Sequence, residues 1–223
     1  MSVEEVRGAI ARRYAPVYSE LIIKLKGERA ERAPTPMPSP IRHLLEQGGL
    51  IVVGSPDVHG PFLARARDQH LAVKLALFLG GLGGSRMKVK LDTEITNDDL
   101  EENLISIGGP TVNMLTWRVN RELPIYFDVE KENQIVSRVS GRVYGEDVNG
   151  VVETVPNPFA KDKTLLVLAG KRIEGTRASV VAFTEKLPEL SLGNIYDRGL
   201  MVKVVEGIDR DSDGLIDDVV ILE

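Results

Sequence analysis

The fold class of this 223-residue chain is decided by the stretch Asn103-Leu-Ile-Ser-Ile-Gly-Gly-Pro-Thr-Val-Asn113. Residues 104–107 are mostly apolar, and a short apolar run between turn signals is typical of a buried strand. Gly108, Gly109 and Pro110 then form a tight corner, since glycine adopts backbone angles that other residues avoid. A helix is expected to follow over 111–122. A strand that turns directly into a helix is the repeating unit of α/β proteins.

Strands and helices alternate on both sides of this stretch. Further strands are expected at 50–53, 87–95, 124–127 and 164–168, and further helices at 61–79, 98–102 and 175–186. Thr96 or Asn97 would cap the short helix at 98–102. Two β-hairpins are added, one pairing 134–144 with 148–155 and one pairing 201–205 with 219–222. We therefore predict a three-layer α/β fold for residues 41–223, with a mostly parallel, Rossmann-like sheet and β-hairpin additions.

The residues before this domain have a different character. Residues 1–32 are rich in helix formers and place apolar residues along one face, which predicts a helical arm. Residues 33–40, Ala-Pro-Thr-Pro-Met-Pro-Ser-Pro, predict a stiff, extended linker. An isolated short helix is marginal in water, so the apolar face of the arm needs a partner. We expect a homodimer formed through this arm, with packing of the arm on its own domain as the alternative.

Composition excludes some classes of function. The net charge of −5 and the pI of about 5.4 argue against nucleic acid as the main partner, although the arm contains basic residues (Arg12, Arg13, Lys24, Lys26). The absence of cysteine excludes disulfides and thiolate metal sites. No apolar stretch is long enough to span a membrane, and the first residues lack a secretory signal, so a cytoplasmic location is expected. The content of Lys, Arg and Glu is compatible with a thermophilic source.

The most specific motif is the acidic segment Asp209-Arg-Asp-Ser-Asp-Gly-Leu-Ile-Asp-Asp218. Carboxylates at alternate positions, followed by a glycine, are typical of a short loop that wraps around a calcium ion. Strand-like sequences flank the segment, so we expect it at the tip of a hairpin. The expected ligands are the side chains of Asp209, Asp211 and Asp213, the carbonyl of Leu215, and Asp217 or Asp218. The alternative is an exposed acidic turn without an ion.

Two glycine-rich corners suggest a second site. Gly108 and Gly109 precede a helix that contains Asn113, and Gly175, Thr176 and Arg177 open the helix after strand 164–168. Helix amino ends attract anions, and ligands of open α/β sheets gather at the carboxyl ends of the strands. The loop after strand 50–53 adds Asp57 and His59 at the same edge, where a general base or a metal ligand could be built. The glycines would otherwise serve only tight packing, and Asp57 and His59 only loop structure.

Several of these segments resemble the carboxyl-terminal part of archaeal surface-layer (S-layer) proteins. They are residues 103–113, Val151-Val-Glu-Thr-Val-Pro-Asn-Pro-Phe159, Leu168-Ala-Gly-Lys-Arg-Ile-Glu-Gly-Thr-Arg-Ala178 and the acidic segment. The resemblance covers about 103–223. It implies an α/β unit with Gly-Gly-Pro corners and carries no catalytic residues. Because of this resemblance, association with the cell surface remains an alternative to the expected cytoplasmic location.

Two functions remain open from the sequence. The first is a non-catalytic structural or interaction module stabilised by calcium. The second is a Rossmann-like protein that binds a small ligand or nucleotide, or a hydrolase, which would use the glycine corners together with Asp57 and His59. No sequence motif in the chain indicates a particular chemical reaction.

Overall fold

The computed structural model describes residues 37–84 and 86–223, and residues 37–223 form one compact unit. The predicted arm at 1–32 and the first residues of the predicted linker lie outside the described residues. Ser39 and Pro40, placed in the linker from sequence, lie in the first turn of a helix. The described helices are α2 (Ser39–Gln47), α3 (Gln69–Gly81), α4 (Asn97–Leu100), α5 (Met114–Val119), α6 (Ile173–Glu185) and α7 (Leu187–Leu190).

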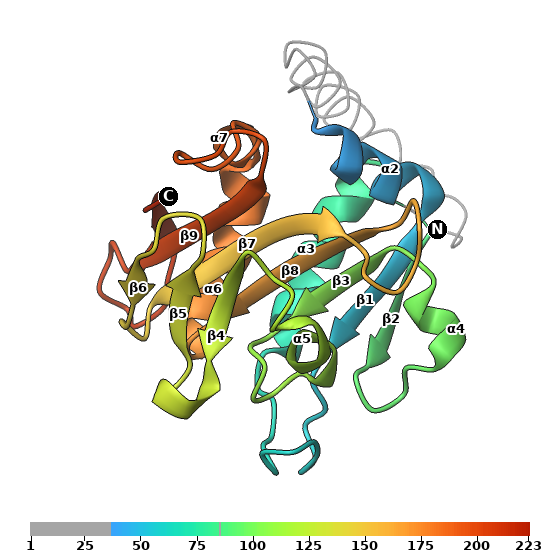
Figure 1. Cartoon of the computed structure of the whole chain (residues 1–223), viewed down its shortest axis with the longest axis horizontal. Helices are drawn as coiled ribbons and strands as arrows, with labels where there is room; N and C mark the ends of the chain where they lie inside the picture. Colours follow the sequence, from blue (N-terminus) through green and yellow to red (C-terminus); the bar gives the residue numbers. More distant parts are fainter. Residues whose placement is uncertain (1–36, 85) are drawn as a thin grey trace, which may run out of the picture. The chain divides into compact units, whose positions relative to one another are not determined.

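A seven-stranded sheet forms the centre of this unit (Figure 1). Its order is β10 (Asp218–Ile221), β9 (Met201–Ile208), β7 (Asn149–Pro156), β8 (Thr164–Gly170), β3 (Leu104–Ile107), β1 (Gly49–Val53) and β2 (Met87–Leu91). The pairs β1–β2, β1–β3 and β3–β8 are parallel, whereas β7–β8, β7–β9 and β9–β10 are antiparallel. The sheet is therefore mixed, and the predicted mostly parallel, Rossmann-like sheet is not confirmed.

The predicted pairing of strands in the middle of the chain was wrong. Residues 134–144 do not form a hairpin with 148–155. They contribute β5 (Gln134–Ser137) and β6 (Val143–Tyr144), which join β4 (Ile125–Asp128) in a separate antiparallel sheet, with a short 3-10 helix (Val129–Lys131) between β4 and β5. Strand β7 instead lies between β8 and β9 in the main sheet. Its Val151, Val152 and Glu153 are consecutive and all buried, as expected of a central strand covered on both faces.

Two apolar cores lie on opposite faces of the main sheet. Alternate residues of β1 divide between them, Ile51 and Val53 facing α3 and α6, and Leu50 and Val52 facing α5 and the small sheet. In Figure 1, α5 and β4–β6 lie in front of the sheet and α3 and α6 behind it. The layered α/β arrangement is thus present, with a second sheet as part of one layer.

Helix boundaries follow local capping. The expected helix at 61–79 begins only at Gln69, because residues 55–66 form a loop closed by hydrogen bonds from Ala66 N to the Ser55 carbonyl (2.9 Å) and between His59 and Ala64. The expected helix at 111–122 is shortened to α5, whose amino end is capped by Asn113. The predicted cap at Thr96 is confirmed, since Thr96 and Asp99 form a reciprocal capping box at the start of α4.

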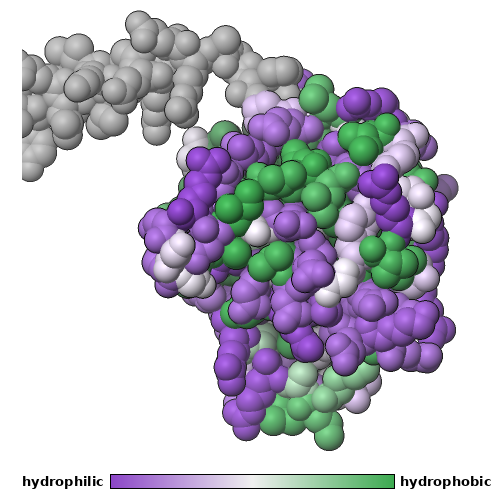
Figure 2. Space-filling model, turned by 90° about the vertical axis from the view of Figure 1, so that its left-hand side faces the viewer, coloured by the Kyte–Doolittle hydropathy of each residue, from purple (hydrophilic) through white to green (hydrophobic). Residues whose placement is uncertain are grey.

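Figure 2 shows the side of the molecule on which β6 lies in Figure 1. Hydrophilic residues predominate on this face, and hydrophobic residues form smaller groups between them. Exposed apolar side chains in small groups are ordinary on protein surfaces and do not by themselves mark an interface.

Candidate functional site

The topology opens a crevice at the carboxyl ends of β1, β3 and β8. The chain leaves β1 and β8 toward the face that carries α3 and α6, but it leaves β3 toward α5 on the opposite face. Neighbouring strands whose connections depart to opposite faces leave a space between the connections, where ligands of open α/β sheets bind. The long loop after β1 projects beyond this edge of the sheet (Figure 1).

Asn113 holds the two central strand ends together. Its side-chain amide donates to the carbonyl oxygens of Val52 (3.1 Å) and Ile107 (2.9 Å). Its side-chain carbonyl accepts from the backbone N–H groups of Leu115 (2.9 Å) and Thr116 (3.3 Å). With these four bonds and almost complete burial, Asn113 serves the structure of the edge and does not face a ligand.

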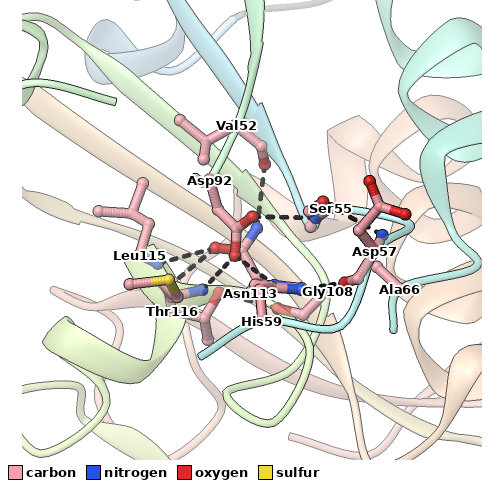
Figure 3. Close-up of polar contacts among 12 residues, drawn as sticks. Val52, Ser55, Asp57, His59, Ala66, Asp92, Gly108, Asn113, Leu115 and Thr116 are labelled. Atoms are coloured by element: carbon pink, nitrogen blue, oxygen red, sulfur yellow. Dashed lines mark hydrogen bonds and ion pairs between the residues drawn. The ribbon is translucent and has the colours of Figure 1, made fainter. Parts of the chain in front are cut away.

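A largely buried hydrogen bond between His59 and Asp92 joins the loop after β1 to the end of β2 (Figure 3). The Nε2 atom of His59 lies 2.8 Å from Oδ2 of Asp92, and its Nδ1 atom lies 2.7 Å from the Asp57 carbonyl oxygen. Asp92 also accepts hydrogen bonds from the backbone N–H groups of Ser55 (2.9 Å) and Met114 (2.8 Å). Burial lowers the pKa of His59, but the Asp57 carbonyl and the Asp92 carboxylate outweigh it and raise the pKa above its ordinary value of 6.5.

The carboxylate partner of His59 is therefore Asp92 and not Asp57. Asp57 contributes only its backbone, and its exposed carboxylate points away from the imidazole (Figure 3). Asp92 was missed from the sequence. It directly follows β2, so the rule that polar residues at the carboxyl ends of strands gather at one edge could have found it. Because every polar atom of this pair is held by the fold, we assign it to positioning of the loop.

A cavity of about 340 Å³ lies at the same edge, between the loops that follow β1, β3 and β8. Gly109 and Thr176, both predicted from the sequence, line it, together with Arg65, Arg67 and Asp68, which were not predicted. Asp57, His59, Asn113 and Arg177 do not line it. A larger hollow of about 640 Å³ lies at the opposite edge, where residues of both charges mix along its rim.

The glycine corners have separate packing roles. A Cβ atom on Gly175 would lie 1.9 Å from the Asn149 carbonyl oxygen, and one on Gly109 would lie 2.8 Å from that of Gly170. Gly108 has a φ of +110°, and a Cβ atom there would lie 2.6 Å from Oδ2 of Asp68. Arg177 contacts His70, with Nη2 and Nε2 3.1 Å apart, and so links α6 to α3.

The acidic segment forms the tip of the β9–β10 hairpin, as predicted. Carboxylate oxygens of Asp209, Asp211 and Asp217 all lie within 4.8 Å of one another. Calcium–oxygen distances of about 2.3–2.6 Å allow two ligands of one ion to be up to about 5.2 Å apart, so this spacing fits a shared cation. Gly214 has a φ of +88° and makes the reversal that the motif predicts.

The remaining predicted ligands are placed differently. Asp213 lies outside the three-carboxylate group, and its Oδ1 accepts from the Leu215 N–H (2.8 Å). Asp218 forms an ion pair with Arg210 and lies 3.6 Å from Lys186 Nζ. A backbone N–H donated by Val219, followed by the Arg210 guanidinium, lowers the pKa of Asp218. Asp217 and Asp218 were the two alternatives for the last ligand of the ion, and Asp217 is the one near the other carboxylates.

Comparison with known proteins shows that part of this chain is similar to a family. Residues 86–187, which run from the start of β2 to the start of α7, match the family described as "S-layer like family, outer domain". The match begins before the predicted resemblance at 103 and ends before the acidic hairpin. Comparison with curated proteins found no match. Within the described residues, no helix combines the length and apolar character needed to cross a membrane. The region from 86 to 187 is thus related to the S-layer outer domain.

Proposed function

We propose that this chain is a non-catalytic structural or interaction module, related to S-layer outer domains, that binds one calcium ion at its terminal hairpin. The family match supports the structural role. The observation that carries the calcium proposal is the convergence of Asp209, Asp211 and Asp217 at the hairpin tip. The site holds the hairpin, and through β9 the edge of the main sheet, in one conformation.

The physical reason is charge. Three carboxylates close together repel one another, and a hard divalent cation with oxygen ligands removes this repulsion. Ile216 of this loop is buried and packs closely on Gly207 of β9, where an added Cβ atom would lie 2.8 Å from the Ile216 side chain. Ion binding would therefore add to a loop that is already anchored on the core. The carboxylates would be occupied by the ion, which suits a structural and not a catalytic role.

Thermal unfolding of the full chain tests the proposal. A ligand that binds only the folded state at a hundredfold excess over its Kd stabilises by about 2.7 kcal/mol. We expect calcium to raise Tm relative to chelator, and Asp211→Asn to remove this shift. Asp57→Asn, which removes one exposed charge elsewhere, is the matched control and should keep it. Equal Tm values with calcium and with chelator for the unmodified chain would refute the calcium proposal.

A further inference from the structure

The cavity at the carboxyl ends of β1, β3 and β8 has a basic rim. Arg65 and Arg67 come from the loop after β1, and Lys171 and Arg172 from the corner after β8. Lys171 is held by Asp147 (2.9 Å), and Arg172 lies 3.7 Å from the same carboxylate. Arg65 and Arg67 form no ion pair with any carboxylate of residues 37–84 and 86–223. Two exposed guanidinium groups beside one cavity are therefore available to an anion.

The amino end of α6 lies at the same cavity. Ile173 and Thr176 line it, and the N-cap residue Arg172 makes no side-chain capping bond. The first turn of this thirteen-residue helix carries partial positive charge that attracts anions. The Gly175 N–H donates to the Asp147 carbonyl (3.2 Å), so the N–H groups of Ile173 and Glu174 are the ones left for an anion. The helix end and the two arginines approach the cavity from different loops, so both can act on one bound group.

Asp68 provides an independent sign of a ligand. It is 3% exposed and lines the cavity, and its Oδ1 atom has no hydrogen-bond partner among the described residues. It also occupies the N-cap position of α3 without making the side-chain bond that an aspartate there normally makes. A buried carboxylate oxygen without a donor is costly. A donor on a ligand in the cavity would satisfy it.

We propose that this cavity binds a small hydroxylated phosphate ester of the sugar-phosphate type. Arg65, Arg67 and the amino end of α6 hold the phosphate, and a ligand hydroxyl donates to Oδ1 of Asp68. The volume of about 340 Å³ is near the lower end of the range for small-molecule sites, which favours a monosaccharide-sized ligand over a dinucleotide. This site is separate from the acidic hairpin and does not depend on the calcium proposal.

Calorimetric titration of the full chain without calcium tests the site. The probes are ribose 5-phosphate, inorganic phosphate and ribose. We expect ribose 5-phosphate to bind about tenfold or more tightly than inorganic phosphate, because the ester can place its phosphate at the arginines and a sugar hydroxyl at Asp68 at the same time. Ribose alone should give no signal. Arg65→Ala combined with Arg67→Ala should weaken the binding of ribose 5-phosphate and of inorganic phosphate at least about tenfold. Arg121 is an exposed arginine outside the cavity lining, so Arg121→Ala is the matched control and should leave both affinities unchanged.

Asp68→Asn separates the two halves of the proposal. It should keep binding of inorganic phosphate and lose the preference for the ester, provided that circular dichroism shows a folded chain. If this variant fails to fold, the double arginine variant still decides, because both arginines are exposed. The proposal is overturned if the unmodified chain binds neither phosphate at millimolar concentration, or if the double arginine variant binds both as well as the unmodified chain does.

Discussion

The side-chain amide of Asn113 donates to the carbonyl oxygen of Val52 at 3.1 Å, which ties the start of α5 to the end of β1 across the end of β3. The same amide also reaches Ile107, so one residue joins both central strands at the edge where the cavity lies. This edge is thus built around a buried polar side chain whose hydrogen-bonding capacity is fully used.

Replacing this residue is expected to destabilise the fold strongly. Asn113→Ala leaves two strand carbonyls and two helix N–H groups without their partner, and we expect a loss of about 2–4 kcal/mol in the free energy of unfolding. Urea denaturation measures it. The exposed Asn97→Ala should cost far less. A loss of less than about 1 kcal/mol for Asn113→Ala would show that these bonds contribute little.

A pH effect on stability is expected from Asp68. Burial, together with the nearby Asp92 charge, raises the pKa of Asp68 from 3.8 to about 6. The folded state therefore holds this proton more tightly than the unfolded state. The corresponding stability is fully present below pH 3.8 and is lost as the pH rises through about 6. A pKa shift of this size corresponds to about 3 kcal/mol in the free energy of unfolding.

The Asp68→Asn variant isolates this contribution. Its free energy of unfolding should lack the decline between about pH 4 and pH 6 that Asp68 contributes to the unmodified chain. Denaturant titrations at several pH values, with the unmodified chain measured in parallel, give the difference directly. Identical pH profiles for the two proteins would contradict the raised pKa.

Self-association through residues 1–32 remains a proposal based on the apolar face of the predicted arm. Light scattering of the full chain should give the mass of a dimer, and a chain that begins at Met37 should give that of a monomer. Residues 37–223 form a compact unit, so the shortened chain is expected to fold. A monomeric full chain at high concentration would favour the alternative, in which the arm packs on its own domain.

Much of the local structure could be predicted from sequence because its signals are local. The strand at Leu104–Ile107 has the predicted bounds, Thr96 caps α4, and the terminal hairpin is present. Its pairing differs from the prediction, because β10 pairs with 205–208 and not with 201–205. The pairing partners of β7 were not predictable in this way. Whether Val151 and Val152 pair with 134–144 or with β8 and β9 depends on contacts distant in sequence.

For the candidate sites, too, features with local signals could be predicted and features that depend on distant residues could not. The acidic loop is contiguous, so its placement on a hairpin and the three aspartates that converge there followed from spacing. His59 and Asp92 are 33 positions apart, and Asp68 lies in a stretch that was read as helix. The pattern 61–79 suggested a continuous helix because Phe62 and Ala66 have helical spacing. The return of the loop at Ala66 overrides that local preference.

The most direct test of the central proposal is a calcium titration of the metal-free full chain by calorimetry. We predict one site per chain, lost in Asp211→Asn and kept in Asp218→Asn, because Asp218 pairs with Arg210 and lies outside the carboxylate group. Magnesium should bind much more weakly, since it demands a tighter octahedral shell. Absence of calcium binding at millimolar concentration, or equal binding by Asp211→Asn, would contradict a calcium-stabilised module.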